Sequence, residues 1–377
     1  METLLGKTLG ELKTLVKELG MPNFTAKQIF DWLYKKKVSS IDDMTNISQK
    51  HREALMNIAV IADKAVVAGL TRNPLIGRTN PIRQQKSADG TVKYLFPCRG
   101  LRVKPAMTAK QSEAHNAMTA EQSEQSERAV ETVFIPDRER ATLCVSTQAG
   151  CKMNCLFCMT GKQGFNGQLS AGEILNQILS IPENDRLTNL VFMGMGEPLD
   201  NTDEVLKVLE ILTSEEGFAW SPKRITVSSV GIIPGLKRLL DESRVHVAIS
   251  LHSPFPQERL SLMPIEKAYP MLDVLNLLSD YDFAHQRRLS FEYICFGGLN
   301  DTPKHSAALA QLLRSIPYAR VNLINYHQTP GVALPASNPQ AMVVFRDYLN
   351  SKGIICTIRS SRGEDILAAC GMLSTKN

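Results

Sequence analysis

The chain has 377 residues, 43% of them hydrophobic and 21% charged, which is typical of a globular protein with one large domain and smaller attachments. No run approaches the roughly 20 apolar residues needed to cross a bilayer, and the first residues lack the basic and apolar regions of a signal peptide, so we expect a cytoplasmic protein with no membrane partner. The net charge is +5, but residues 1–104 carry 18 Lys and Arg against 9 Asp and Glu. A polyanion is therefore expected to dock on the N-terminal part, with a solvated basic face as the alternative.

Residues 1–60 have the pattern of a small helical accessory domain. Leucines recur at helical spacing over residues 4–19, and Gly20 follows as a C-terminal cap. A second helix is predicted from Thr25 to the cationic run at residues 35–37, where positive charge suits the helix dipole, and a third over residues 49–58.

Residues 61–140 are predicted to be a strand-rich connecting region that carries a disordered insert. Strands are expected at residues 65–68 and 91–96, the second after an Asp89-Gly90 turn. The insert, residues 105–130, contains the near-repeat Ala-Met-Thr-Ala-(Lys/Glu)-Gln-Ser-Glu at positions 106 and 117. Its only large apolar residues are methionines, so it cannot bury enough apolar surface to offset the entropy of ordering.

From residue 141 to residue 377 predicted strands and helices alternate, which indicates a parallel sheet with helices outside. The predicted strands are 141–146, 190–193, 225–228, 245–251, 289–295, 321–325 and 355–358; the predicted helices are 171–181, 202–212, 233–240, 271–278, 304–313 and 340–349. We therefore expect an α/β fold built as a partial (β/α)6 barrel, with site residues at the carboxyl ends of the strands.

The strongest local signal is Cys151-Lys-Met-Asn-Cys155-Leu-Phe-Cys158, a set of three thiols on a loop after a predicted strand. An iron–sulfur cube normally takes four cysteines, and no fourth lies in this loop, so one iron is expected to stay open for another ligand. A zinc site completed by a remote Cys or His is the alternative, but zinc sites usually pair CxxC with a second pair, and none is present.

The chain resembles the dual-specificity RNA adenine-2 methyltransferases of the radical S-adenosylmethionine superfamily. The CxxxCxxC motif carries the superfamily resemblance, and four further segments narrow it: Cys144-Val-Ser-Thr-Gln-Ala-Gly-Cys151, Phe192-Met-Gly-Met-Gly-Glu-Pro-Leu199, Ser250-Leu-His-Ser253 and Asp365-Ile-Leu-Ala-Ala-Cys-Gly371. The resemblance covers nearly the whole chain apart from the insert. It implies a radical-type partial barrel and methylation of carbon 2 of adenine 2503 in 23S rRNA and adenine 37 in tRNA.

The same resemblance implies the cofactors and their ligands. Cys151, Cys155 and Cys158 would hold a 4Fe–4S cluster, and two molecules of S-adenosylmethionine would be used per turnover. The residues implied to bind this cofactor are Gly196, Glu197, Ser228, Ser250, Leu251, His252 and His327, the last standing where the family usually has Asn. Without the cysteines, the Gly-x-Gly turn and the polar strand ends would be read as ordinary structure.

Three further residues are implied to carry the chemistry. The target carbon is not nucleophilic, so the family first methylates a cysteine, here Cys370, and then converts that methyl group to a radical that adds to the ring. Glu131 matches the general base that takes the ring proton. Cys144 matches the thiol that resolves the protein–RNA crosslink, and a disulfide bond is expected in this scheme. As lone cysteines, both would more often be buried core residues.

The expected partners are 23S rRNA and tRNA, an electron donor such as flavodoxin, and no second copy of the chain. Candidate phosphate contacts lie in the basic N-terminal part: Lys35, Lys36, Lys37, Arg72, Arg78, Arg83, Arg99 and Arg102. Three alternatives remain open at this stage: methylation of carbon 8 by a resistance-type enzyme, a nucleic-acid-binding protein with a structural metal, and a radical enzyme that acts on a small metabolite.

Overall fold

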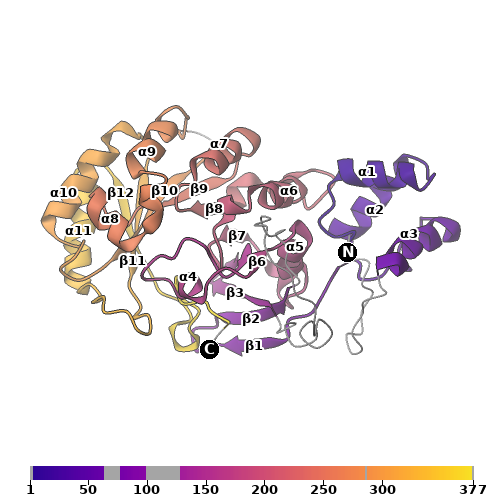
Figure 1. The fold of residues 1–377 in the computed structure, drawn as a ribbon, viewed down its shortest axis with the longest axis horizontal. Coiled ribbons are helices and arrows are strands. Elements are labelled where there is room, and N and C mark those ends of the chain that lie inside the picture. Colours follow the sequence, from indigo (N-terminus) through magenta and orange to yellow (C-terminus); the bar gives the residue numbers. More distant parts are fainter. Residues whose placement is uncertain (1–2, 63–76, 99–127, 285–286, 376–377) are drawn as a thin grey trace, which may run out of the picture.

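The computed structural model describes residues 3–62, 77–98, 128–284 and 287–375 (Figure 1). The strand predicted at residues 65–68 and nearly all of the predicted insert lie outside the described residues. The last two residues assigned to that insert, Ala129 and Val130, already belong to strand β3 (Ala129–Asp137). The insert boundary at residue 130 was therefore two residues too late, because both side chains are buried in the sheet.

Three helices form the N-terminal part: α1 (Leu9–Glu18), α2 (Phe24–Tyr34) and α3 (Gln49–Ala62). The expected start of the first helix near Leu4 is wrong, because Thr8 and Glu11 form a capping box that starts it at Leu9. Gly6 precedes this cap with a φ of +94°, and a Cβ there would lie 2.3 Å from the backbone nitrogen of Gly172. The segment before α1 thus passes so close to Gly172, in helix α5 (Ala171–Leu179), that only glycine fits at position 6.

Ten strands form one sheet, in the order β1-β2-β3-β4-β7-β8-β9-β10-β11-β12. Its antiparallel part comprises β1 (Arg83–Lys86), β2 (Val92–Pro97) and β3, which pairs with β4 (Arg140–Cys144). The strands parallel to β4 are β7 (Asn189–Phe192), β8 (Ile225–Ser229), β9 (His246–Ser250), β10 (Leu289–Cys295), β11 (Arg320–Asn325) and β12 (Ile355–Arg359). The predicted α/β class and parallel barrel-type sheet are confirmed, and β12 adds a seventh parallel strand.

Helices cover one face of this sheet, as expected for right-handed βα connections (Figure 1). They are α5 (Ala171–Leu179), α6 (Thr202–Thr213), α7 (Ile233–Glu242), α9 (Met271–Ser279), α10 (Pro303–Leu312) and α11 (Pro339–Ser351). Two short helices, α4 (Met159–Gln163) and α8 (Pro256–Leu262), were not predicted, since neither is long enough to show a helical period. None of the helices in the described ranges is long and apolar enough to span a bilayer.

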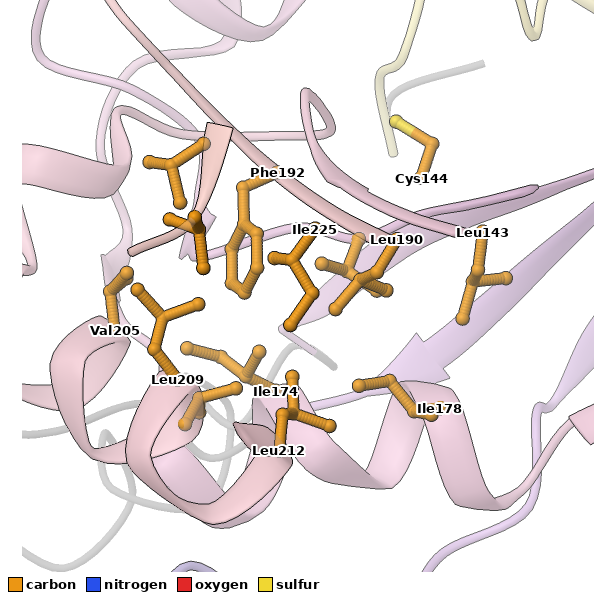
Figure 2. Close-up of a cluster of buried hydrophobic side chains, with 14 of the residues drawn as sticks. Leu143, Cys144, Ile174, Ile178, Leu190, Phe192, Val205, Leu209, Leu212 and Ile225 are labelled. Atoms are coloured by element: carbon orange, nitrogen blue, oxygen red, sulfur yellow. The ribbon is translucent and has the colours of Figure 1, made fainter. Parts of the chain in front are cut away.

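The two faces of the sheet have different chemistry, which is clearest at the end of β4. Leu143 is fully buried and points toward Ile178 of α5, whereas the sulfur of Cys144 points away from that apolar cluster, toward the C-terminal segment (Figure 2). Successive strand residues face opposite sides, so one strand supplies both a core residue and a site residue. We call the side of Leu143 the outer face and the side of Cys144 the inner face.

After β12 the chain returns across the open side of the sheet as an irregular segment, residues 360–375, which we call the C-terminal segment. Its backbone is fixed to the first strands: the Gly363 N–H donates to Asp89 at 3.0 Å, and the Ala88 N–H donates to Asp365 at 3.1 Å. Arg362 also pairs with Asp137 at 3.3 Å. These contacts hold the segment that contains Cys370 against the turn between β1 and β2 and the end of β3.

Candidate functional site

The three cysteines of the CxxxCxxC motif lie on a loop between the two-residue strand β5 (Gln148–Ala149) and helix α4. Gly150 precedes the loop with a φ of +75°, and a Cβ there would lie only 1.6 Å from the carbonyl oxygen of Gly164. The loop backbone is fixed by the Cys151 N–H, which donates to that same carbonyl at 3.2 Å, and by the Leu156 N–H, which donates to Leu262 at 2.9 Å. The loop is therefore built mainly by backbone bonds, and the contact to one of its thiols is the Met153 N–H, which lies 3.5 Å from the Cys151 sulfur.

The loop borders a cavity of about 150 Å³ at the carboxyl ends of the parallel strands. Nine of the predicted site residues line it: Cys151, Cys155, Cys158, Gly196, Glu197, Ser228, Ser250, His252 and Cys370. Four do not: Glu131, Cys144, Leu251 and His327. The position of the cavity agrees with the rule that barrel-type sheets bind ligands at their carboxyl ends.

Within the described ranges no three His, Cys, Asp or Glu side chains are arranged around the position of a single metal ion. A zinc ion needs four ligands at about 2.0–2.3 Å, so the zinc alternative has no ready ligand set in this part of the chain. In an iron–sulfur cube each iron takes its own thiolate, so the three sulfurs need not meet at one point. The arrangement around the cavity therefore suits a cube better than a single ion.

Glu197 presents a buried carboxylate at one wall of the cavity. Its Oε1 accepts from the Leu199 N–H and its Oε2 from the Val230 N–H, both at 3.0 Å. Burial nevertheless raises the pKa of this carboxyl to about 7. A cationic ligand group would stabilise the ionised form, as the amino group of a bound amino acid does.

Gly196 lets the chain pass close to β5 in front of this carboxylate. Its φ is +99°, and a Cβ there would lie 2.5 Å from the side chain of Gln148. The Gln148 side-chain oxygen in turn accepts the Glu197 N–H at 2.8 Å. The glycine is thus required by the turn that presents Glu197 to the cavity.

His252 is a buried neutral imidazole that also lines the cavity. Its Nδ1 accepts the Ile294 N–H at 3.0 Å, so its hydrogen is on Nε2. Burial and the nearby Arg259 guanidinium lower the pKa of His252 to about 3. The ring packs edge-on against Phe157 of the cysteine loop, with centroids 4.9 Å apart.

Arg259 organises the strand ends beside His252 and was not identified from the sequence. The guanidinium is fully buried, pairs with Glu266, and donates to the carbonyl oxygens of Val230 at 2.9 Å, Ser250 at 3.1 Å and Leu251 at 3.2 Å. Leu251 is itself fully buried, so its contribution to the site is its backbone. A single arginine thus fixes the ends of β8 and β9.

Cys370 brings a further thiol to the cavity from the C-terminal segment. The next residue accepts a bond from the cysteine loop, since the Met159 N–H donates to the Gly371 carbonyl at 2.8 Å. Cys370 is exposed to solvent, yet protein atoms surround it closely enough that desolvation raises the pKa of its thiol, with Arg359 opposing the rise. The predicted carrier thiol and the predicted cluster loop are therefore adjacent.

Cys144 lies behind Cys370 on the inner face, at the end of β4. It is buried, and burial together with the neighbouring Cys370 raises the pKa of its thiol to about 12. All eight cysteines are free thiols. The expected disulfide bond is absent from this structure and stays a prediction.

Glu131 lies on β3, also on the inner face, because Val133 two residues along pairs with Cys144. Its Oε1 pairs with Lys93 at 2.9 Å, and its Oε2 accepts the N–H of Ser374 at 2.9 Å. The sequence did not single out Lys93, although Thr91-Val-Lys-Tyr-Leu-Phe alternates as a strand and places a lysine among inward-facing positions.

The inner face also carries a buried polar network that sequence analysis missed. Glu292 lines the cavity and accepts from Ser290 at 3.0 Å and from Asn322 at 2.8 Å, and it pairs with Arg359 at 3.4 Å. The alternation of residues along β10 predicts that Ser290 and Glu292 lie on the same side of the sheet. It does not predict which side of the sheet faces the site.

His327 does not reach the cavity. Its Nε2 is 2.7 Å from the hydroxyl of Ser361 and 3.7 Å from Glu364, both on the C-terminal segment. Here it connects the loop after β11 to that segment. Its proposed cofactor contact has no support in this geometry.

Several of the basic residues proposed to contact phosphate have other partners. Arg78 donates to the carbonyl oxygens of Lys37 at 2.5 Å and Leu179 at 2.6 Å, and so links the N-terminal part to α5. Lys37 pairs with Asp185 at 2.6 Å, and Lys36 lies over the ring of Trp32 at 3.4 Å. Arg72, Arg99 and Arg102 lie outside the described residues.

Comparison with known proteins gives a consistent picture. A model of the radical SAM superfamily matches residues 145–310, and a model of the ribosomal RNA large subunit methyltransferase N-terminal domain matches residues 3–61. The chain is 55% identical to a protein of Parabacteroides distasonis named probable dual-specificity RNA methyltransferase RlmN, over 99% of this chain and 96% of that protein. It is 36% identical to the dual-specificity RNA methyltransferase RlmN of Anaeromyxobacter dehalogenans, over 97% and 90% of the two chains.

One solved structure matches along the whole length. The crystal structure of a radical SAM methyltransferase from Sphaerobacter thermophilus is 33% identical in sequence and superimposes with a TM-score of 0.80 over 99% of both chains. The shared fold therefore includes the N-terminal helices as well as the parallel sheet.

Proposed function

The chain belongs to the RlmN family of dual-specificity RNA methyltransferases in the radical S-adenosylmethionine superfamily, and from this we propose that it methylates carbon 2 of adenine in 23S rRNA and in tRNA through a methylated cysteine. One observation carries the proposal above the others. The cavity at the carboxyl ends of the strands is lined both by Cys151, Cys155 and Cys158 and by Cys370. A cluster-bound cofactor and a carrier thiol would share this space.

The residues present fit a 4Fe–4S cluster with S-adenosylmethionine beside it. Cys151, Cys155 and Cys158 would each ligate one iron, and Glu197, Ser228 and Ser250 would contact the cofactor from the opposite walls. When bound, the cluster supplies the electron that cleaves S-adenosylmethionine to a radical, which suits methylation of a carbon that is not nucleophilic. Two molecules of S-adenosylmethionine would serve one turnover, one as methyl donor to Cys370 and one for cleavage.

Cys370 carries the methyl group and Glu131 completes the substitution at the ring. One hydrogen atom of the thioether methyl group on Cys370 would leave with the 5′-deoxyadenosine that forms from the second S-adenosylmethionine, and the methylene carbon would bond to carbon 2 of adenine. Once this adduct had given one electron back to the oxidised cluster, the carbon 2 hydrogen would leave as a proton to the Glu131 carboxylate, and its bonding electrons would stay in the ring. The contact of Ser374 with Glu131 supports this assignment, since it places the base on the segment that holds Cys370.

Cys144 releases the product. Its sulfur attacks the sulfur of Cys370, a disulfide forms, and the carbon–sulfur bond breaks with its electron pair passing to the methylene carbon, which takes up a proton and becomes the methyl group. An external thiol then reduces the disulfide. The adjacency of the two thiols supports this step. The high pKa of Cys144 means that it must lose a proton in the adduct state to become a good nucleophile.

RNA reaches this site with the help of residues 1–104, whose excess of Lys and Arg suits phosphate. The target base must leave its stack to enter the cavity. A small acidic electron carrier such as flavodoxin supplies the electrons, the enzyme works as a monomer, and it acts in the cytoplasm, where both RNAs are found.

The proposal is tested by mass spectrometry of RNA that carries deuterium at carbon 2 of adenine. We expect methylated adenine that has lost this deuterium. A methylated adenine that retains it would assign the reaction to carbon 8 instead, and RNA without methyl transfer from an enzyme with about four irons would refute the activity.

A further inference from the structure

Lys93 and Glu131 form a buried ion pair on neighbouring strands of the inner face. Lys93 on β2 lies opposite Val133 of β3, so Glu131 is its diagonal neighbour on the same side of the sheet. The Nζ–Oε1 distance is 2.9 Å, and the two side chains are only 6% and 3% exposed. Burying two charges costs free energy, and removing one of them leaves the other uncompensated.

The C-terminal segment holds the same pair from the other side. The Ser374 N–H donates to Glu131 Oε2 at 2.9 Å, and Lys93 Nζ donates to the Leu367 carbonyl at 3.5 Å. Each carboxylate oxygen thus has one fixed donor and keeps lone pairs for a further proton. On the C-terminal segment, the acceptor Leu367 and the donor Ser374 flank Cys370 in sequence, so the pair is fixed to the segment that holds this thiol.

The surroundings of Glu131 make Lys93 the main group that keeps the carboxyl ionised. Burial raises the pKa of Glu131, while Lys93, the Ser374 N–H and the more distant Arg83 of β1 oppose the rise. From β4 the group on this face is the neutral Cys144 thiol. The backbone N–H of Glu131 itself contacts the Met195 sulfur at 3.3 Å, which carries no charge.

We infer that Lys93 is a positioning residue whose ammonium group holds Glu131 ionised and aimed at the substrate carbon, an inference that rests on the function proposed above. Without Lys93, the buried carboxyl would take a proton from water and could no longer accept the ring proton. The proton balance of the step involves only the carbon 2 hydrogen and the Glu131 carboxylate. The ion pair stabilises the negative charge of the Glu131 carboxylate, which burial in an apolar site would otherwise destabilise.

The experiment uses the full chain with its cluster reconstituted and measures the pH dependence of RNA methylation. Lys93→Met should slow methylation at neutral pH by about tenfold or more, because the base is mostly protonated, and should move the rising limb of the profile to higher pH. Lys93→Arg should restore most of the rate and the wild-type limb. Lys237→Met, which removes an exposed lysine on α7 paired with Asp241, is the matched control and should change neither.

A double variant protects the test against a folding defect. Lys93→Met combined with Glu131→Gln removes both buried charges and should fold. In the Glu131→Gln background, loss of Lys93 should cost nothing further if Lys93 acts through Glu131. A Lys93→Met enzyme with an unchanged pH limb, or an additional loss in the double variant, would overturn the inference.

Two separate readouts distinguish failure of this inference from failure of the proposed function. Methylation of Cys370 and formation of 5′-deoxyadenosine precede the proton transfer, so both should persist in Lys93→Met. If Glu131→Gln methylates RNA at the wild-type rate, the base assignment is wrong and the inference is overturned with it. If the wild-type enzyme never methylates Cys370, the proposed function itself fails.

Discussion

The outer and inner faces of the sheet are made by the same strands but do different work. On the outer face, Leu143, Leu190 and Phe192 pack with the apolar sides of α5 and α6, and almost nothing polar interrupts them (Figure 2). On the inner face, the neighbours of these residues include Cys144 and Met193, and polar side chains reach the cavity. Because successive residues of a strand point to opposite faces, one strand supplies core residues to the outer face and site residues to the inner face.

The inner face accommodates the buried carboxylates of Glu292 and Glu131 because both have partners. Glu292 has three, and Glu131 has both Lys93 and the C-terminal segment. Buried polar groups without partners would be strongly destabilising, so the site depends on complete networks rather than on apolar packing. We expect substitutions on the two faces to differ accordingly: those on the inner face change activity, and those on the outer face change stability.

The largest effect is expected at the cysteine loop. Cys155→Ala should abolish iron binding and methylation, because two remaining thiolates cannot hold an ordered cube. The thermal midpoint of the metal-free protein should stay close to that of the metal-free wild type, since backbone bonds rather than the thiol build the loop. Iron analysis after anaerobic reconstitution measures the cluster content of the variant. An iron content equal to that of the wild type would show that Cys155 does not hold the cluster.

A large effect of the opposite kind is expected on the outer face. Leu143→Ala should lower the free energy of unfolding by about 2–5 kcal/mol, because it leaves a cavity in a close-packed core. Urea titration of the two proteins gives the difference. At urea concentrations below the unfolding transition, the methylation rate per folded molecule should remain near that of the wild type. A clearly lower rate in fully folded Leu143→Ala would contradict the division of roles between the two faces.

The smallest effect is expected at a helix end on the outer face. Ser170 caps α5 in a reciprocal pair with Glu173. Ser170→Ala should cost about 1 kcal/mol of stability, because one helix N–H loses its side-chain acceptor. Activity should be unaffected. Changed iron loading in this variant would show that α5 supports the site directly.

The sequence predicts the outer face well because apolar periodicity is a local property. Strand β10 was predicted with its exact ends, since apolar Leu289, Phe291 and Tyr293 alternate with Ser290 and Glu292, which is the period of a strand. The cysteine loop, Gly196 and Glu197 were located from local motifs in the same way. Nine of the predicted site residues line one cavity, although they come from several different loops and strand ends.

The inner face was predicted less completely because its networks depend on tertiary contacts. Lys93 and Arg259 were not singled out in the sequence, because their burial and their acidic partners come from residues distant along the chain or from the packing of α8. The contact of His327 with Ser361 could not be predicted, because the two residues meet only when the C-terminal segment returns to the loop after β11. Leu4 and Leu5 were assigned to a helix, although α1 begins only at Leu9. Both leucines are buried, and a buried leucine outside a helix gives the same apolar pattern in the sequence as one inside it.

The most direct test of the central claim is peptide mass spectrometry of the Cys144→Ala enzyme after incubation with S-adenosylmethionine, a reductant and RNA, followed by nuclease and protease digestion. The account predicts that the crosslink can form but cannot be resolved, so the peptide that contains Cys370 should carry a methylene-linked adenosine. A Cys370 peptide that never gains either a methyl group or a nucleoside, in an enzyme that still methylates RNA, would contradict it.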